Sequence, residues 1–213
     1  MAKLIEIIKQ ITELLKSLLF EVEKVEQKNN DEKLIKEICD FIEEIIHTGK
    51  NNPFTKTAYM NFKESNGNNR SKDIDEMNKR NGVSLGAPYC MTGIQDIMRA
   101  VEKKFNVKFD LPATPSTQEF WTKSKTDYKL TSPKTFTVAI FRKGETWQGH
   151  AALCLGAINS QEFSTFEFNT SPQATSEIIR DGEGCYFKVR PVAGYGDMKL
   201  RGFVDIFKSM KKL

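Results

Sequence analysis

The spacing of apolar residues changes along this 213-residue chain from the period of a helix to the period of a strand. In residues 1–48, and again in residues 90–105, apolar positions recur every three or four residues, which predicts amphipathic helices. From Thr135 onward come five short aromatic or β-branched runs, separated by turn signals: TFTVAIFRK, HAALCLGAI, EFSTFEFNT, GCYFKVRPV and LRGFVDIFK. We therefore expect an α+β domain in which a helix packs on a mostly antiparallel β-sheet.

Residues 1–48 predict an N-terminal α-helical hairpin. The segment KNND interrupts the first helix, and a second amphipathic helix over residues 34–46 follows before the stop at HTGKNNP. Such a hairpin in isolation would expose too much apolar surface to water, so we expect it to pack on the main domain, on a second copy or on another partner. In its first helix, apolar residues at alternating steps of four and three form a heptad seam: Leu4, Ile8, Ile11, Leu15, Leu18, Val22 and Val25.

Charge is divided unequally between the two parts of the chain. Residues 1–48 hold 7 Lys and 11 Asp or Glu, a net charge of −4, and the remainder holds 25 basic and 17 acidic residues, a net charge of +8. The acidic polar side of the hairpin favours packing or self-association over membrane binding. Residues 49–72 are expected to form a polar linker, and residues 73–213 a basic main domain that suits an anionic partner such as a cell wall or nucleic acid.

Several classes of protein are excluded by simple counts. No apolar run approaches the ~18 residues that a membrane span requires. The N-terminus lacks the continuous apolar segment of a secretory signal, so we expect synthesis in a cytoplasm. The widely spaced cysteines Cys39, Cys90, Cys154 and Cys185, with only two histidines, argue against a zinc site and for free thiols. Cys154 and Cys185 lie mid-strand among apolar neighbours, which indicates core packing.

Cys90 is the candidate nucleophile. It follows the Gly-Ala-Pro turn of SLGAPYC and opens the predicted helix over residues 90–105. Proline is favoured at a helix start, where the N–H groups of the first turn have no helical acceptor. The positive end of the helix dipole favours a thiolate, and the same N–H groups can stabilise an oxyanion. A buried, inert cysteine at a helix start is the ordinary alternative.

A thiol nucleophile needs a base, and the sequence offers His47 and His150. His47 ends the hairpin, where compensation of the helix dipole is the ordinary interpretation. His150 opens a strand, and Glu167 and Asn169 lie two residues apart on the next strand, so that either can orient the imidazole. Each residue alone also fits an ordinary half-exposed surface, but the ordered set predicts a Cys-His-Glu or Cys-His-Asn site.

These motifs resemble the CHAP domain, the cysteine- and histidine-dependent amidohydrolase/peptidase family of the papain-like superfamily. The resemblance covers residues 73–206 and rests on GAPYC, GHAALCLG, TFEFNTSP and the closing segments RDGEGCYFKVRPV and LRGFVDI. It implies a papain-like fold in which Cys90 is the nucleophile and His150 the general base. Glu167 would then orient the histidine, with Asn169 as a supporting polar residue.

Three further residue sets bear on the resemblance. Tyr89 stands where the family usually has Trp, and with Trp147, on the turn before His150, it is expected to bind substrate. Some members of the family bind calcium through acidic residues upstream of the cysteine. This chain has Asp73 and Asp75 there, but the rest of such a loop is missing, so we expect no metal and no other cofactor.

The resemblance implies a peptidoglycan hydrolase that works through a thioacyl-enzyme. The scissile bond is either the N-acetylmuramoyl-L-alanine amide or a peptide bond of the stem or cross-bridge. A phage-type endolysin or an injected antibacterial effector would reach the cell wall after lysis or injection; the expected partner is peptidoglycan, not nucleic acid. Two alternatives stay open: a non-catalytic assembly or binding protein that uses the hairpin, and a cysteine hydrolase of a substrate outside the cell wall.

Overall fold

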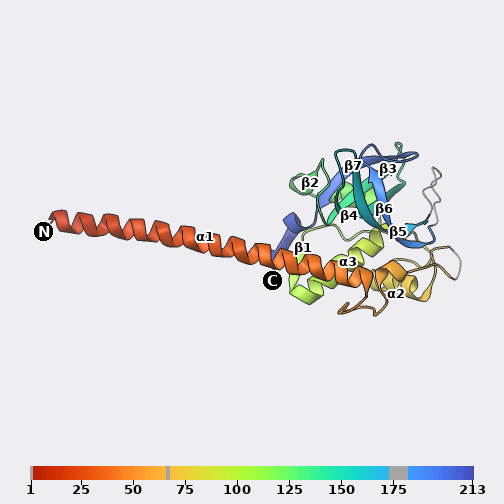
Figure 1. The fold of residues 1–213 in the computed structure, drawn as a ribbon, viewed down its shortest axis with the longest axis horizontal. Coiled ribbons are helices and arrows are strands. Elements are labelled where there is room, and N and C mark those ends of the chain that lie inside the picture. The colour runs from red at the N-terminus through yellow and green to blue at the C-terminus, as the bar shows by residue number, and fades with distance from the viewer. Residues whose placement is uncertain (1, 66–67, 173–181) are drawn as a thin grey trace. The chain divides into compact units, whose positions relative to one another are not determined.

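The computed structural model of the chain describes residues 2–65, 68–172 and 182–213, with side-chain surroundings from residue 13 onward. The described part is an α+β protein with one long N-terminal helix and antiparallel sheets, which confirms the expected class (Figure 1). The chain forms two compact units, Met1–Asp40 and Phe41–Leu213. Within the described residues, no helix has both the length and the apolar character that a membrane span requires.

A single helix, α1 (Ala2–His47), stands where the sequence predicted a hairpin. The expected turn at KNND is wrong, because this segment contains neither glycine nor proline and keeps helical geometry. Side chains four residues apart interact across it. The Gln27 amide donates to the Asp31 carboxylate at 2.8 Å, and Lys28 Nζ lies 3.9 Å from Glu32 Oε1.

The N-terminal unit carries apolar side chains on its surface. The heptad residues Leu4, Ile8 and Ile11 lie outside the described side chains. Further along α1, the following apolar side chains are 54–62% exposed: Leu14, Leu15, Leu18, Leu19, Phe20, Val22 and Val25. The last turns of α1 belong to the C-terminal unit, where Phe41 is buried and meets the ring of Phe105 edge-on, with 5.5 Å between the ring centroids.

The main sheet has the strand order β2-β7-β3-β4-β5-β6, and every pairing in it is antiparallel. Its strands are β2 (Lys129–Leu130), β3 (Thr137–Lys143), β4 (Gly149–Ala157), β5 (Glu162–Thr170), β6 (Gly184–Pro191) and β7 (Met198–Asp205). The five predicted strands are β3 to β7. A second sheet pairs β1 (Val107–Phe109) with β8 (Met210–Lys212). Strands of two or three residues such as β1, β2 and β8 are too short to show a periodicity in the sequence.

One helix packs across the centre of this sheet. Besides α1, the helical elements are η1 (Tyr59–Asn61), α2 (Lys72–Arg80), α3 (Cys90–Phe105), α4 (Thr117–Lys123), η2 (Thr126–Tyr128) and η3 (Phe207–Ser209). Helix α3 packs against β4 and β5 (Figure 1). A Cβ atom at Gly93 would lie 2.2 Å from the ring of Phe168, so the glycine permits this close approach of helix to sheet.

The segment expected to be a polar linker, residues 49–72, is folded onto the main domain. Tyr59 and Phe62 are buried within it, because two aromatic side chains gain more from the core than from solvent. The Tyr59 hydroxyl donates to Asp96 of α3 at 2.7 Å, and Arg80 of α2 donates to the same carboxylate from Nε at 2.9 Å and Nη2 at 2.8 Å. This buried, fully hydrogen-bonded carboxylate ties η1, α2 and α3 together and so fixes the helix that carries Cys90.

Candidate active site

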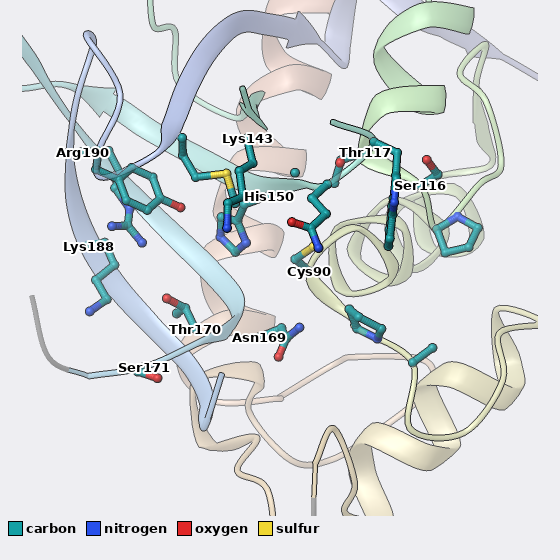
Figure 2. Close-up of a pocket in the computed structure, with 18 of the residues that line it drawn as sticks. Cys90, Ser116, Thr117, Lys143, His150, Asn169, Thr170, Ser171, Lys188 and Arg190 are labelled. Atoms are coloured by element: carbon teal, nitrogen blue, oxygen red, sulfur yellow. The ribbon is translucent and has the colours of Figure 1, made fainter. Parts of the chain in front are cut away.

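The predicted Cys and His residues line one cavity of about 400 Å³, and the predicted Glu contacts the His from the buried side. Cys90 is the first residue of α3, His150 is the second residue of β4, and Glu167 lies in the middle of β5. Figure 2 shows the side chains of Cys90 and His150 next to one another at this wall. The packing of α3 on β4 and β5 therefore brings residues from three distant segments into one site.

The imidazole of His150 is held by a buried carboxylate. His150 Nε2 lies 3.0 Å from Glu167 Oε2, and neither residue is more than 8% exposed. Because a carboxylate only accepts hydrogen bonds, Nε2 is the nitrogen that carries the proton in this contact. The ring then presents Nδ1 to the Cys90 thiol, with which it is hydrogen-bonded.

This arrangement favours a thiolate–imidazolium pair. Burial by itself would raise the pKa of Cys90, but the hydrogen bond and charge of His150, with the N–H groups of Ala151 and Met91, lower that pKa below its ordinary value. Burial also disfavours the imidazolium, yet the hydrogen bonds with Cys90 and Glu167 raise the pKa of His150 to about 9. At neutral pH the imidazole of His150 is therefore protonated.

The carboxylate is itself held by two further side chains. Burial would raise the pKa of Glu167, but the hydrogen bonds from Arg190 and His150 keep that pKa well below its usual range. Arg190 donates to Oε1 from Nε at 2.7 Å and to Oε2 from Nη2 at 2.5 Å, and the Thr165 hydroxyl donates to Oε1 at 2.7 Å. The guanidinium lies 3.8 Å from the centroid of the Tyr195 ring. Glu167 is thus fixed in place and ionised.

Arg190 and Tyr195 were missed by the sequence analysis. Arg190 lies in the closing segment RDGEGCYFKVRPV, but it was assigned no role there, and Tyr195 lies outside the motifs. The one available signal is that Arg190 alternates with Lys188 along a predicted strand, which places both on one face. That face meets the site only because β6 pairs with β5 in the observed register, with Lys188 opposite Thr165.

The other cysteines differ from Cys90. Cys154 and Cys185 are buried in the sheet, as predicted for core residues, and burial raises the pKa of both thiols. Cys39 is half-buried on α1, and none of the four described cysteines forms a disulfide. Of the two sheet cysteines and Cys90, only the residue beside His150 has a lowered pKa, so the chemical environment singles out Cys90.

The N-terminus of α3 adds hydrogen-bond donors to the site. The first helical bond runs from the Gly93 N–H to the Tyr89 carbonyl at 2.9 Å, so the N–H groups before Gly93 precede the regular ladder. A substrate carbonyl placed against this helix end can accept hydrogen bonds while its carbon lies near the Cys90 sulfur. This geometry can stabilise the oxyanion that forms when the sulfur attacks.

Asn169 lines the cavity, but its contact differs from the predicted one. The pairing of β5 with β6 is irregular between Glu167 and Thr170, and Asn169 has a left-handed φ of 54°. Its Oδ1 accepts a hydrogen bond from the Gly182 N–H at 3.0 Å. Of the two residues predicted to orient His150, Glu167 is the one whose contact with the ring the structure shows.

The two aromatic residues expected to bind substrate have different surroundings. Trp147 lines the cavity and is 74% exposed, so it can contact a bound molecule. Tyr89 is fully buried, and its hydroxyl lies 3.4 Å from Glu64 Oε1. Tyr89 therefore packs in the core and does not contact substrate as expected, because its ring points away from the cavity.

The cavity wall is cationic. Its described lining residues include Lys143, Lys188 and Arg190 and no aspartate or glutamate. Figure 2 shows Lys188 and Arg190 on the same side of the cavity as the hydroxyls of Thr170 and Ser171. Such a wall favours a substrate that carries negative charge.

The acidic residues considered for calcium are engaged elsewhere. Asp73 accepts a hydrogen bond from the Thr57 hydroxyl at 3.2 Å, and Asp75 forms an ion pair with Arg70 at 2.7 Å. Among the described residues, no group of three His, Cys, Asp or Glu side chains could hold a metal ion.

Comparison of the chain with protein-family models, curated proteins and solved structures finds no match. Any functional conclusion therefore rests on the chemistry of the site. The strongest functional evidence is the chain of hydrogen bonds from the Cys90 thiol through His150 and Glu167 to Arg190.

Proposed function

We propose that this protein is a cysteine hydrolase of amide bonds, with Cys90 as nucleophile and His150 as acid and base. The lowered pKa of the buried Cys90 thiol and the raised pKa of its hydrogen-bonded partner His150 support this proposal. Reactive cysteines of hydrolases have this environment, whereas structural cysteines are inert thiols. The arrangement of a cysteine-bearing helix on an antiparallel sheet agrees with the papain-like, CHAP-type fold that the sequence resembles.

The proposed reaction has two halves, and the second restores to His150, from water, the proton that the first gives to the leaving nitrogen. The thiolate attacks the amide carbon, a C–S bond forms, and the oxyanion is stabilised at the N-terminus of α3. The imidazolium of His150 then gives its proton to the leaving nitrogen, the C–N bond breaks, and a thioester remains. Neutral His150 next takes a proton from water, the hydroxide attacks the thioester, and the departing thiolate of Cys90 pairs again with the imidazolium.

The proposed substrate is an amide bond of peptidoglycan, either between muramic acid and L-alanine or within the stem peptide or cross-bridge. The net charge of +8 outside residues 1–48 and the lysines Lys143 and Lys188 on the cavity wall support an anionic polymer. The protein would then act as a phage-type endolysin or an injected antibacterial effector.

Loss of turbidity of purified cell walls tests this proposal. The native chain is expected to clear the walls, Cys90→Ala to leave them intact, and Cys39→Ala, which removes a thiol outside the site, to clear them as the native chain does. Circular dichroism shows whether each variant is folded, and mass spectrometry of the released fragments identifies the bond that is cut. Undiminished clearing by a folded Cys90→Ala variant would contradict the proposed nucleophile.

A cysteine hydrolase with a substrate outside the cell wall is the second candidate, because the same site supports it. Alkylation of Cys90 by iodoacetamide, combined with the cell-wall assay, separates the two possibilities, since alkylation reports the thiolate without any substrate. Rapid alkylation near neutral pH together with intact cell walls would move the proposal to another amide substrate. Slow alkylation with the pH dependence of an ordinary thiol would remove the catalytic proposal altogether.

A further inference from the structure

Helix α1 presents an apolar stripe that the proposed hydrolase chemistry does not use. We define the stripe as Leu14, Leu15, Leu18, Leu19, Val22 and Val25, each of which is 54–62% exposed. Side chains of this kind at helical spacing remain in water only at a cost, so a stripe of this length marks an interaction surface.

The spacing within the stripe selects a helix as its partner. With heptad positions named a to g, Leu15 and Val22 occupy position a, and Leu18 and Val25 occupy position d. In the sequence the same alternation of four and three begins at Leu4, so it extends over three heptads. A repeat sustained over this length is typical of a coiled coil, in which each a or d side chain enters a hole between four residues of a facing helix.

We infer that α1 self-associates by pairing antiparallel with α1 of a second copy of this chain. A second copy supplies a stripe with the same repeat. The charged residues beside the seam decide the direction, because positions e and g of the two helices face each other across it.

In a parallel pair, each g residue faces the e residue five positions later in the other copy. Leu14 then faces Leu19, Glu21 faces Glu26, and Lys28 faces Lys33. Each charged pair joins like charges and occurs twice in a symmetric dimer, which is unfavourable.

One feature favours the parallel direction, since the two Asn29 side chains would meet at position a. This single amide pair stands against four pairs of like charges. The balance therefore favours the antiparallel direction.

In an antiparallel pair, g faces g and e faces e. In the register that places Leu15 beside Leu18 of the other copy, the six apolar a and d residues from Ile8 to Val25 all lie opposite apolar a or d residues of the other copy. In this register Glu21 faces Leu14 of the other copy, and the sequence then places no like charges opposite each other in the seam. This is the arrangement that we assign to the dimer.

Sedimentation equilibrium of the full chain tests the association. The expected mass is twice the 24.3 kDa of one chain. Leu18→Lys puts a charge into the seam and is expected to give a monomer. Ser17→Lys adds the same charge at an exposed neighbouring position outside the stripe and is expected to remain a dimer. A native chain that is monomeric over the whole accessible concentration range, including one that binds phosphatidylcholine vesicles instead, would overturn the inference.

Cross-linking with a short bis-maleimide tests the direction of the pair. Leu18→Cys and Val25→Cys both place a thiol at position d. In the assigned register the two thiols of a Leu18→Cys dimer are offset by three residues, about 5 Å along the axis, and those of a Val25→Cys dimer by 17 residues, about 25 Å. We expect a cross-linked dimer for Leu18→Cys only, above the background that the native thiols give in the unmodified chain. Equal cross-linking at both positions would show a parallel pair and overturn the assignment.

Discussion

Replacing Glu167 with Gln tests the electrostatic basis of the site. The change removes the negative charge that lies 3.0 Å from His150 Nε2 while it keeps the length and shape of the side chain. The pKa of His150 is raised from its ordinary 6.5 to about 9. That difference corresponds to a factor of about 300 in the protonation equilibrium, or about 3 kcal/mol.

The contact with Glu167 is strong enough to account for this difference. Two unit charges at this separation interact by about 5 kcal/mol at an effective dielectric constant of about 20. This exceeds the about 3 kcal/mol needed for the raised pKa and leaves a remainder to offset the burial of the imidazolium. Without the carboxylate, only the contact with Cys90 opposes burial, and the pKa of His150 should fall below about 9.

The consequence should appear at Cys90. With the imidazolium disfavoured, the buried thiol loses part of what lowers its pKa, and the thiolate fraction near neutral pH should fall. The rate of iodoacetamide alkylation between about pH 5 and pH 10, with the modified residue identified by mass spectrometry, measures this fraction directly. The alkylation curve of Glu167→Gln should therefore shift to higher pH than that of the native chain.

A matched double variant separates charge from packing. Glu167→Gln alone leaves the Arg190 guanidinium buried without its carboxylate, which also disfavours a charged His150. The variant Glu167→Gln with Arg190→Met removes both charges, and its alkylation curve should also shift to higher pH. An unchanged alkylation curve in both folded variants would refute the reasoning, because the pKa of Cys90 would then not depend on the carboxylate.

Three further expectations follow from the same contacts. Amide hydrolysis should fall as pH rises through about 9, because His150, whose pKa is raised in the folded protein, then loses the proton that it gives to the leaving nitrogen. The pH dependence of kcat/KM measures this fall. A flat profile around pH 9 would contradict the role of His150 as the acid. Gly93→Ala should lower the free energy of unfolding by about 1–3 kcal/mol, because its Cβ would lie 2.2 Å from the Phe168 ring; urea unfolding measures the loss, and an unchanged midpoint would argue against this packing. Arg190→Met should lower that free energy by about 3–5 kcal/mol, because the buried Glu167 carboxylate loses its bidentate partner. Arg190→Lys should keep only part of the free energy that Arg190→Met loses, since a lysine cannot form both hydrogen bonds to the carboxylate. Native stability in Arg190→Lys would show that charge alone suffices.

Local sequence signals determined much of this protein. The change from helical to strand periodicity is a property of neighbouring residues, and it predicted α3, the strands β3 to β7 and the α+β class. The Gly-Ala-Pro turn before Cys90 likewise placed the thiol at a helix start without reference to the rest of the chain. His150 and Glu167 were identified because their types suit thiol chemistry and because they lie on successive strands.

Local signals failed where two weak preferences competed. The segment KNND has low helix propensity, which favours a turn. The pairs Gln27–Asp31 and Lys28–Glu32 support a helix there instead, and no glycine or proline opposes it.

Other features were decided only by the tertiary structure. Arg190 reaches Glu167 across 23 positions of sequence, and this contact exists only in the observed register of β5 with β6. An irregular pairing after Glu167 redirects Asn169, and the packing around the start of α3 buries Tyr89. The physical reason is that a side chain's neighbours across a sheet depend on strand register, where a slip of one residue reverses every face. Local sequence therefore determined α3, the strands β3 to β7 and which residues suit the chemistry, and the fold decided which of those residues meet.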